Sequence, residues 1–324
     1  MVQPEPLPSA PFAEDAIDPS VWFEANAEAW LDAIVGFTPR TTTLDLTTAD
    51  CRALLGACKA GDAAAAALGP LEARLEGAIA AFVDLAGAAF VKTSCRSPKD
   101  ATVADGRIRA IFDEAVAAGR ASTPDAALVA LYTASLQALR VTTAREALAL
   151  LVSSGRVEQD LELAVAAVAS AGGGGVCMAL LVREFLPGLH VEQEFRGIVF
   201  GGSLNAVTQY FGEIFFERLQ DGRVRGAILA AIVALFERVR GLIPLQNYIV
   251  DFAVDEAGVA TILELNPYAP STTACLYYAW TKDRALFEAG PLRDIRINSV
   301  RTTPGKLKHA VLREWTPFVE HFWA

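Results

Sequence analysis

The chain has few of the residues that build disulfide frameworks or zinc sites. Its 324 residues include five cysteines and three histidines. The number of cysteines is odd, none of them forms a Cys-X-X-Cys pair, and they stand at positions 51, 58, 95, 177 and 275. We therefore expect neither a zinc site nor structural disulfides, and the composition favours a reducing, cytoplasmic setting.

Basic side chains are scarce relative to acidic ones. Lys and Arg total 28 against 38 Asp and Glu, which gives a net charge of −10 at pH 7 and an isoelectric point near 4.9. Because nucleic-acid binding needs clustered Lys and Arg, no nucleic-acid partner is expected. A local basic pocket that binds a small anion remains compatible with this charge.

No stretch predicts a signal peptide or a membrane span. Residues 1–20 are rich in proline and acidic residues without a basic segment before an apolar run, and we expect a flexible amino-terminal arm there. Residues 163–182 carry no charge, but four consecutive glycines at 172–175 would each cost a helix roughly 1 kcal/mol. This stretch therefore predicts a helix, a turn and a buried strand, and no membrane partner is expected.

The order of expected elements predicts an α+β protein of two lobes. With 53% hydrophobic residues the chain can fill a large core. We expect an amino-terminal lobe at 21–185 with a helical insertion, and a carboxyl-terminal lobe at 186–324 with a docked tail. The periodicity predicts strands at 41–46, 88–93, 176–185, 192–200, 204–211, 248–254 and 259–265, and helices at 21–37, 48–59, 71–85, 228–239 and 316–323. Several alanine-rich helices, broken near Gly119 and Pro124, are expected within 101–170.

The strands at 248–254 and 259–265 predict an antiparallel hairpin with a clustered polar face. Side chains alternate between the faces of a strand, so Glu264 and Asn266 point the same way. If the two residues that flank the turn pair directly, Asp251 lies opposite Ile262 and diagonal to Glu264. Two carboxylates and an amide oxygen are hard ligands that suit Mg²⁺. The hairpin therefore predicts a magnesium site at Asp251, Glu264 and Asn266.

Two alternatives remain open for this hairpin. Asp251 and Glu264 would be ordinary charges if this face of the hairpin is exposed to solvent. A bulge in the turn at Gly258 would shift the pairing by one residue and change the geometry.

A buried lysine suggests a second polar site. Lys92 stands in the apolar strand 88–93 and is followed by a polar, serine-containing loop at 94–100. A lysine in such a strand is costly to bury unless it meets an anion, so Lys92 and the loop are candidates for binding phosphate. The alternative is a lysine whose stem lies on apolar surface with its head in water.

Another candidate lies in the strand at 192–200. Glu194 and Arg196 share one face of this strand by the period of two. The guanidinium of Arg196 offers a planar fork to a phosphate group. The alternative is an ion pair between Arg196 and Glu194, worth under about 1 kcal/mol if it is exposed.

Four stretches together resemble one family. They are FVKTSCRSPKDA at 90–101, LLVREFLPG at 180–188, EFRGIVFGGSLNAVTQY at 194–210 and the hairpin segment at 248–280. In this order they are similar to the cell division cycle protein 123 family. The resemblance implies an ATP-grasp fold, in which two lobes with antiparallel sheets clasp ATP and Mg²⁺.

The resemblance also implies roles for individual residues. Lys92 and Ser94 would meet the phosphates, Glu184 and Phe185 would form the segment that reads adenine, and Glu194 and Arg196 would contact the nucleotide. The magnesium ligands implied are again Asp251, Glu264 and Asn266. Among the departures from the family pattern, Tyr210 stands where an arginine is usual, and Glu264 replaces an aspartate.

Three functions follow from this resemblance. Family members are similar to chaperones that assemble eukaryotic translation initiation factor 2 by binding its γ subunit, and this is the first expectation. The second is an ATP-grasp ligase that joins a carboxylate to an amine with ATP. The third is a nucleotide-binding regulator without catalysis. The sequence offers no obvious nucleophile or general base beside the expected metal ligands, so catalytic residues stay unassigned.

Overall fold

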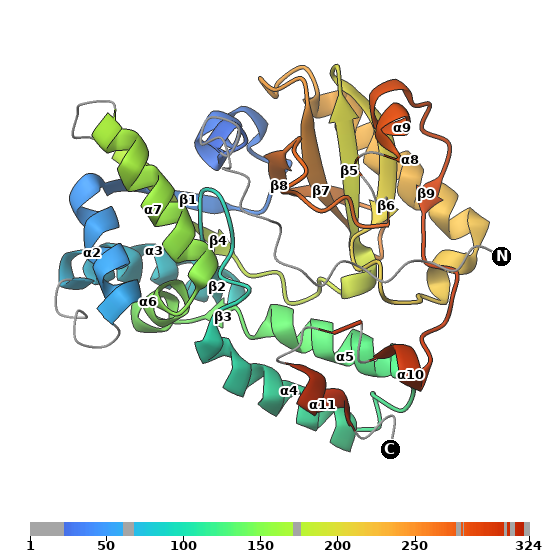
Figure 1. Cartoon of the computed structure of the whole chain (residues 1–324), viewed down its shortest axis with the longest axis horizontal. Helices are drawn as coiled ribbons and strands as arrows, with labels where there is room; N and C mark the ends of the chain where they lie inside the picture. The colour runs from blue at the N-terminus through green and yellow to red at the C-terminus, as the bar shows by residue number, and fades with distance from the viewer. Residues whose placement is uncertain are drawn as a thin grey trace. The chain divides into compact units, whose positions relative to one another are not determined.

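The chain folds into two compact units, each built from segments distant in sequence. The computed structural model describes residues 23–60, 68–170, 176–276, 280, 282–307, 310–311 and 315–320 (Figure 1). The amino-terminal unit contains residues 26–114 and 133–188, and the carboxyl-terminal unit contains the described parts of 23–25, 115–132 and 189–324. The arm expected at 1–20, the four glycines at 172–175 and the last four residues lie outside the described residues.

The amino-terminal unit is built on a four-stranded antiparallel sheet of order β1-β4-β2-β3. The strands are β1 (Thr41–Thr47), β2 (Ala89–Thr93), β3 (Arg140–Val141) and β4 (Val176–Glu184). The central strand β4 is a nearly continuous apolar run, as expected for a strand with neighbours on both sides. Its pairing with β2 places Lys92 opposite Leu181, in the middle of the sheet.

Helices pack against this sheet and against one another. They are α2 (Thr48–Ala60), α3 (Gly69–Ala86), α6 (Ala144–Val152) and α7 (Gly155–Ser170). Helix α2 packs on α7 and helix α3 on α6, and all four contact strand β4 or β2. Helices α4 (Asp105–Ala117) and α5 (Pro124–Gln137) begin and end close to the breaks expected at Gly119 and Pro124. Helix α2 and strand β2 thus form where the sequence pattern predicts them.

The carboxyl-terminal unit is built on a five-stranded sheet of order β8-β7-β5-β6-β9. The strands are β5 (Glu194–Phe200), β6 (Ser203–Gln209), β7 (Tyr248–Val254), β8 (Ala260–Pro267) and β9 (Ile295–Arg296). All neighbours are antiparallel except β6 and β9, which are parallel. The expectation of an α+β protein with antiparallel sheets is thereby confirmed, with β9 as an added parallel edge strand.

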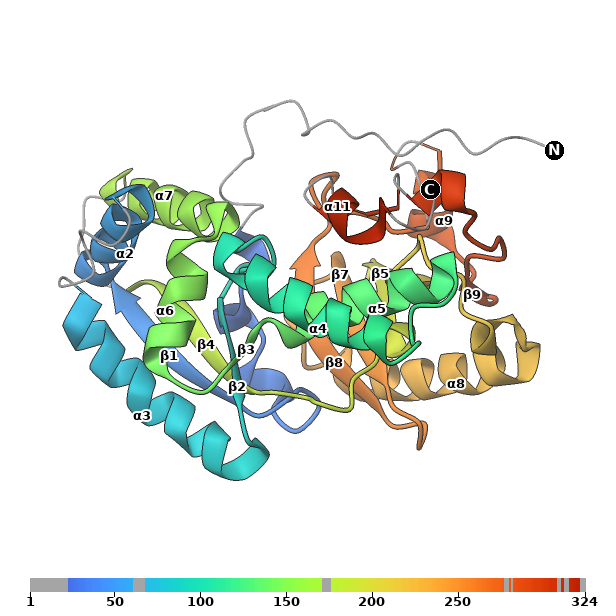
Figure 2. The same cartoon turned by 90° about the horizontal axis from the view of Figure 1, so that it is seen from below.

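Two helices lie on opposite sides of this sheet (Figures 1 and 2). The long helix α8 (Gly222–Val239) packs on β6, β7 and β8, and its buried side chains include Ile232 and Phe236. The short helix α9 (Arg284–Ala289) packs on β5 and β6, where Phe287 joins Ile198 in a small apolar cluster. Since Arg196 is two residues from Ile198, the polar residues of β5 lie on the side that carries α9. Two short helices, α10 (Pro304–Leu307) and α11 (Thr316–Val319), follow β9.

The register of the β7–β8 hairpin differs from the expected one. Val254 pairs with Ala260 because the turn contains Gly258 in a left-handed conformation at φ +79°, which adds one residue. A second irregularity lies between Asp251 and Phe252, where the register steps from Glu264 to Ile262, so Asp251 pairs directly with Glu264. The expected pairing of Asp251 with Ile262 was therefore wrong, and the two carboxylates lie closer in register than predicted.

Two further expectations are tested by the described residues. Residues 26–37 form two short 3₁₀ helices, Ala27–Ala29 and Asp32–Ile34, so the single helix expected there was wrong. The uncharged segment at 163–182 divides into the end of α7 and the start of β4, as expected. Among the residues that the structure describes, no helix is long and apolar enough to cross a membrane.

Candidate functional site

A row of polar residues runs straight across the sheet of the carboxyl-terminal unit. The pairings join Glu264 to Asp251, Asp251 to Arg196, Arg196 to Thr208, and Thr208 to Arg296. Paired residues on neighbouring strands point to the same face, so these five side chains form one line on the side that carries α9. The register alone thus brings together three residues predicted from sequence and two that were not.

The centre of this row is a buried ion pair. Arg196 donates from Nε to Oδ1 of Asp251 and from an Nη to Oδ2, both at 2.7 Å, and from its other Nη to the carbonyl of Thr273 at 2.7 Å. Both residues are nearly inaccessible, at 3% exposure for Arg196 and 4% for Asp251. Burial alone would lower the pKa of Arg196, but the Asp251 carboxylate raises it well above its ordinary value. The sequence offered an ion pair with Glu194 as the alternative to phosphate binding, and the structure pairs Arg196 with Asp251 on the neighbouring strand.

Asp251 also accepts a hydrogen bond from Asn266. The side-chain amide of Asn266 donates to Oδ2 of Asp251 at 3.1 Å. Oδ2 therefore accepts two hydrogen bonds and Oδ1 one, which leaves an acceptor position on Oδ1. The side chains of Glu264 and Asn266 are partly exposed on the same face.

These three residues fit magnesium only as a partial ligand set. Within the described parts of the chain, no group of three or more His, Cys, Asp or Glu side chains is placed to hold a metal ion. Two carboxylates and one amide supply at most three oxygen ligands, whereas Mg²⁺ prefers six and commonly takes the rest from water and substrate phosphates. The hard-oxygen chemistry of Asp251, Glu264 and Asn266 is compatible with such a shared site.

Aromatic and acidic neighbours surround Arg196 at the centre of the row. The guanidinium carbon of Arg196 lies 4.8 Å from the ring centroid of Tyr210, which is a cation–π geometry. Tyr210 is tied to β5 by its amide, which donates to the carbonyl of Glu194 at 2.9 Å. The Glu194 side chain is buried, and it lies on the same face two residues from Arg196. Tyr210, which stands where the resemblance leads one to expect arginine, thus stabilises an arginine instead.

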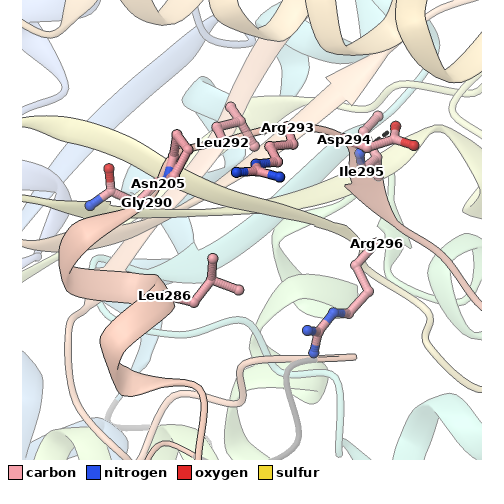
Figure 3. Close-up of a pocket in the computed structure, with 9 residues that line it drawn as sticks. Asn205, Leu286, Gly290, Leu292, Arg293, Asp294, Ile295 and Arg296 are labelled. Atoms are coloured by element: carbon pink, nitrogen blue, oxygen red, sulfur yellow. Dashed lines mark hydrogen bonds between the residues drawn. The ribbon is translucent and has the colours of Figure 1, made fainter.

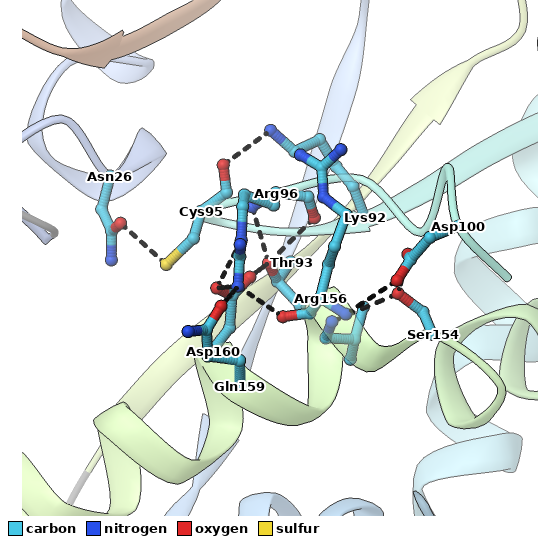
Figure 4. Close-up of polar contacts among 11 residues, drawn as sticks. Asn26, Lys92, Thr93, Cys95, Arg96, Asp100, Ser154, Arg156, Gln159 and Asp160 are labelled. Carbon is cyan, nitrogen blue, oxygen red and sulfur yellow. Dashed lines mark hydrogen bonds and ion pairs between the residues drawn. The ribbon is translucent and has the colours of Figure 1, made fainter. Parts of the chain in front are cut away.

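The amino-terminal unit places Lys92 beneath a tight loop (Figure 4). Lys92 is 3% exposed, which rules out the alternative of a head group in open water. Its ammonium donates to the carbonyl of Cys95 at 3.4 Å. Ser94 is also buried, and its hydroxyl accepts from the amide of Ala179 at 3.3 Å, so this hydroxyl is still able to donate to an anion.

A buried carboxylate on α7 holds this loop in place. Asp160, which is fully buried, accepts from Nε of Arg96 at 2.8 Å and from the hydroxyl of Thr93 at 3.0 Å. The same guanidinium donates to the carbonyl of Arg156 at 2.7 Å and to the side chain of Gln159 at 2.9 Å. Nothing in the sequence had singled out Asp160, because it stands in an alanine-rich helix far along the chain. An acidic residue on the buried stripe of that helix, together with Leu161 and Ala164, was the available signal.

Glu184 and Phe185, expected to read adenine, lie at the end of β4. The carboxylate of Glu184 accepts from the backbone amide of Arg40 at 3.1 Å and from its Nε at 2.9 Å. The backbone amides of Glu184 and Phe185 both donate within the sheet, to the carbonyls of Arg40 and Ala88. A ligand at this segment would therefore contact the Phe185 side chain or the remaining backbone carbonyls.

The nine predicted site residues divide between the two units. Lys92, Ser94, Glu184 and Phe185 belong to the amino-terminal unit, and Glu194, Arg196, Asp251, Glu264 and Asn266 to the carboxyl-terminal unit. Each unit brings one group together. In the amino-terminal unit it is the loop next to Lys92, and in the carboxyl-terminal unit it is the row centred on Arg196 and Asp251.

A pocket of about 480 Å³ lies on the carboxyl-terminal unit (Figure 3). It is lined by Asn205, Leu286 and residues 290–296. None of the predicted residues lines it, although Arg296 also forms the end of the polar row. The guanidinium of Arg296 donates to the carbonyl of Leu276 at 3.1 Å and lies 3.5 Å from the carboxylate of Asp283. This arginine and Thr208 were missed from sequence because their place depends on the parallel pairing of β6 and β9.

Comparison with known proteins gives one family and several structures. The profile of the D123 family matches residues 121–303, a little over half of the chain. No curated protein sequence matches the chain. The structure of Cdc123 from Schizosaccharomyces pombe matches with a TM-score of 0.62 and 20% identity, covering 87% of this chain and 98% of that one.

A second Cdc123 structure matches equally well, and a synthetase matches less well. A C-terminally truncated Cdc123 from the same yeast gives the same TM-score of 0.62 at 20% identity, covering 87% of this chain and 98% of that one. D-cycloserine synthetase DcsG matches at a TM-score of 0.34 and 15% identity, over 83% of this chain and 69% of that one, which is too low to carry an argument. The two Cdc123 structures establish the fold.

Proposed function

Since the chain belongs to the D123 family, the family of Cdc123, we propose that it binds ATP together with Mg²⁺. The observation that carries this proposal is the buried pair of Arg196 and Asp251, bordered by Glu264 and Asn266 on one face of a sheet. Charged side chains on the inner face of a sheet add little stability to a protein. A row of them therefore favours a role in binding.

Each group has a role in this proposal. Lys92 and Ser94 bind phosphate oxygens. Glu184 and Phe185 form the segment that contacts the adenine ring. Glu194 and Arg196 also contact the nucleotide. Asp251, Glu264 and Asn266 would hold Mg²⁺, which would supply positive charge next to the phosphate groups. Arg196 has a second task, since it fixes the Asp251 carboxylate through two hydrogen bonds and leaves one acceptor position on Oδ1 for the ion.

We further propose that the nucleotide-bound protein acts in the cytoplasm as an assembly factor for translation initiation factor 2, through its γ subunit. The support is family membership and the resemblance of the motifs at 90–101, 194–210 and 248–280. The proposal is one of nucleotide binding, and it assigns no catalytic residue.

The nucleotide part is tested by calorimetric titration of the full chain with ATP in buffer that contains Mg²⁺. Wild-type protein is expected to bind ATP, and Lys92→Met to lose most of that affinity, because methionine fills the same space without the charge. Lys59→Met is the matched control, since Lys59 is an exposed lysine of the same unit, paired with Glu162 at 2.7 Å. Absence of ATP binding by the wild type would overturn the proposal.

The partner is tested separately with the purified γ subunit of translation initiation factor 2. A complex that survives gel filtration and strengthens with Mg-ATP is the expected result. If no complex forms at micromolar concentrations, the assembly role is wrong, while nucleotide binding stands on its own titration. Formation of ADP during either experiment would point to the ligase alternative.

A further inference from the structure

Three cationic side chains meet at the loop that follows β2. Lys92 lies beneath the loop, Arg96 belongs to it, and Arg156 stands in the first turn of α7. Contacts tie all three together, because the carbonyl of Arg156 accepts from Arg96 and the carbonyl of Cys95 accepts from Lys92. Three positive charges in so small a region repel one another unless negative charge is nearby.

Arg96 has its negative charge within the protein. Its guanidinium is engaged by Asp160, Gln159 and the carbonyl of Arg156, with distances of 2.7 to 2.9 Å. It is therefore turned toward α7 and satisfied there. Arg96 holds the loop and is not available to a ligand without breaking these contacts.

The side chain of Arg156 differs in this respect. Within the part of the chain that the structure describes, its guanidinium has no hydrogen bond or ion pair, and its Nε is buried without an acceptor. A buried donor without an acceptor is uncommon in folded proteins and points to a group that binds there. Figure 4 shows this side chain leaving α7 and passing the loop, with its guanidinium on the same side as the ammonium of Lys92.

The backbone around Arg156 is fixed independently. Its amide donates to Asp100 at 3.0 Å, and the hydroxyl of Ser154 donates to the other oxygen of the same carboxylate at 2.6 Å. The hydroxyl of Ser154 also accepts from the amide of Val157, so the first amides of α7 are occupied. An anion at this place would be bound by side chains and not by the end of the helix.

We propose that Arg156 is a second phosphate-binding residue, which joins Lys92 in holding the phosphate groups of the nucleotide. This inference rests on the proposed function and adds a residue to that site. The planar fork of a guanidinium binds two oxygens of one phosphate, whereas the ammonium of Lys92 acts as a compact charge. Arg156 would add to Lys92 a guanidinium whose buried Nε has no acceptor among the described residues.

The test compares ligands with and without phosphate on one variant. Adenosine, ATP and pyrophosphate are each titrated into wild-type protein and Arg156→Met by calorimetry, in buffer that contains Mg²⁺. Loss of one charge-assisted pair of hydrogen bonds is expected to weaken ATP and pyrophosphate about tenfold to a hundredfold. Affinity for adenosine is expected to stay unchanged, which a merely structural role for Arg156 would not produce.

Two further variants complete the test. Arg156→Lys keeps the charge without the fork and is expected to recover part of the affinity for ATP. The matched control is Arg109→Met, which removes an exposed arginine of α4 in the same unit that forms an ion pair with Asp113 on its own helix. Its three affinities are expected to equal those of the wild type.

The outcomes separate this inference from the proposed function. If wild-type protein binds ATP and Arg156→Met binds ATP and pyrophosphate equally well, Arg156 is a solvated arginine and the inference is overturned alone. If wild-type protein binds pyrophosphate but not ATP, and Arg156→Met loses pyrophosphate, the anion site stands and the proposed nucleotide function falls. Binding of neither ligand by the wild type overturns both.

Discussion

Each unit of the molecule contains a buried pair of one arginine and one aspartate, built in different ways. In the carboxyl-terminal unit, Arg196 and Asp251 are neighbours on adjacent strands, and register places them face to face. In the amino-terminal unit, Arg96 reaches from a loop to Asp160 on a helix. The Arg196 side chain is 4% exposed and the Arg96 side chain 18%.

The difference in construction predicts a difference in role. A pair fixed by two strands cannot separate without distortion of the sheet, so Arg196 and Asp251 would offer the proposed ligand a rigid contact. A pair that joins a loop to a helix controls the position of the loop. Asp160 therefore orders the loop that follows Lys92. One pair is suited to contact a nucleotide, and the other to position the residues that do.

The largest expected effect comes from breaking the strand-borne pair. Asp251→Ala leaves the Arg196 guanidinium buried without its partner, and we expect a loss of about 3–5 kcal/mol in the free energy of unfolding. Urea denaturation followed by circular dichroism measures it. The double variant Arg196→Met with Asp251→Leu is expected to lose less, because no charge is left buried. A loss below about 1 kcal/mol for Asp251→Ala would show that water reaches Arg196.

Breaking the loop-to-helix pair should cost less. Asp160→Asn keeps the shape but removes the charge, and the partly exposed guanidinium of Arg96 can turn to water, so we expect a loss of about 1–3 kcal/mol. Hydrogen exchange of residues 93–100 should accelerate, while exchange across β5 and β7 stays as in the wild type. Asp113→Asn is the matched control, because it removes the charge of a carboxylate that pairs with the exposed Arg109. Unchanged exchange in the loop would contradict the positioning role of Asp160.

The contact between Arg196 and Tyr210 is expected to contribute about 1 kcal/mol. Tyr210→Leu removes the ring over which the guanidinium lies, and Tyr210→Phe keeps it. We therefore expect a lower urea midpoint for the leucine variant and a nearly unchanged midpoint for the phenylalanine variant. Equal losses in both would assign the effect to the hydroxyl and not to the ring.

Two glutamates with opposite pKa shifts extend the comparison to pH. Burial acts to raise the pKa of Glu146 in the amino-terminal unit, but hydrogen bonds from Thr142 outweigh it and lower the pKa. Its stabilising effect is present above the ordinary pKa of glutamate and is lost as the pH falls through the lowered value. Burial raises the pKa of Glu213 in the carboxyl-terminal unit, so this residue reduces stability increasingly as the pH rises from the ordinary value through the raised one.

The measurement is thermal unfolding of Glu146→Gln and Glu213→Gln between pH 3 and pH 8. Relative to wild type, Glu146→Gln is expected to be less stable at neutral pH and equal at the acidic end. Glu213→Gln is expected to be more stable at neutral pH, with the gain vanishing in acid. The same sign for both variants would contradict the assignment.

Much of the fold was predictable from local pattern. The strand Tyr248–Val254 was predicted with its observed bounds, because β-branched and aromatic residues alternate there and a turn follows. Strand β2 and helix α3 formed within one or two residues of the predicted ends. The 3₁₀ turns within 26–37 were not predictable, since Trp22 and Trp30 have helical spacing in the sequence.

The candidate site was predicted only in part, because register and tertiary pairing are not local properties. The sequence indicated Asp251 and Glu264 together and Arg196 apart from them, but the bulge after Asp251 and the pairing of β5 with β7 decided which side chains meet. Asp160 and Arg156 were missed because α7 is read as one of several alanine-rich helices. Their importance follows from their contact with a loop about sixty residues earlier in the chain.

The central claim is that the row of Glu264, Asp251 and Arg196 serves one Mg-ATP. It is tested most directly by the affinity for ATP of wild-type protein and Glu264→Gln, each measured with Mg²⁺ and with Mg²⁺ removed by chelation. We expect Mg²⁺ to strengthen ATP binding to the wild type by about tenfold or more, and Glu264→Gln to lose this gain while keeping the magnesium-free affinity. Equal ATP affinity of the wild type with and without Mg²⁺ would contradict the account.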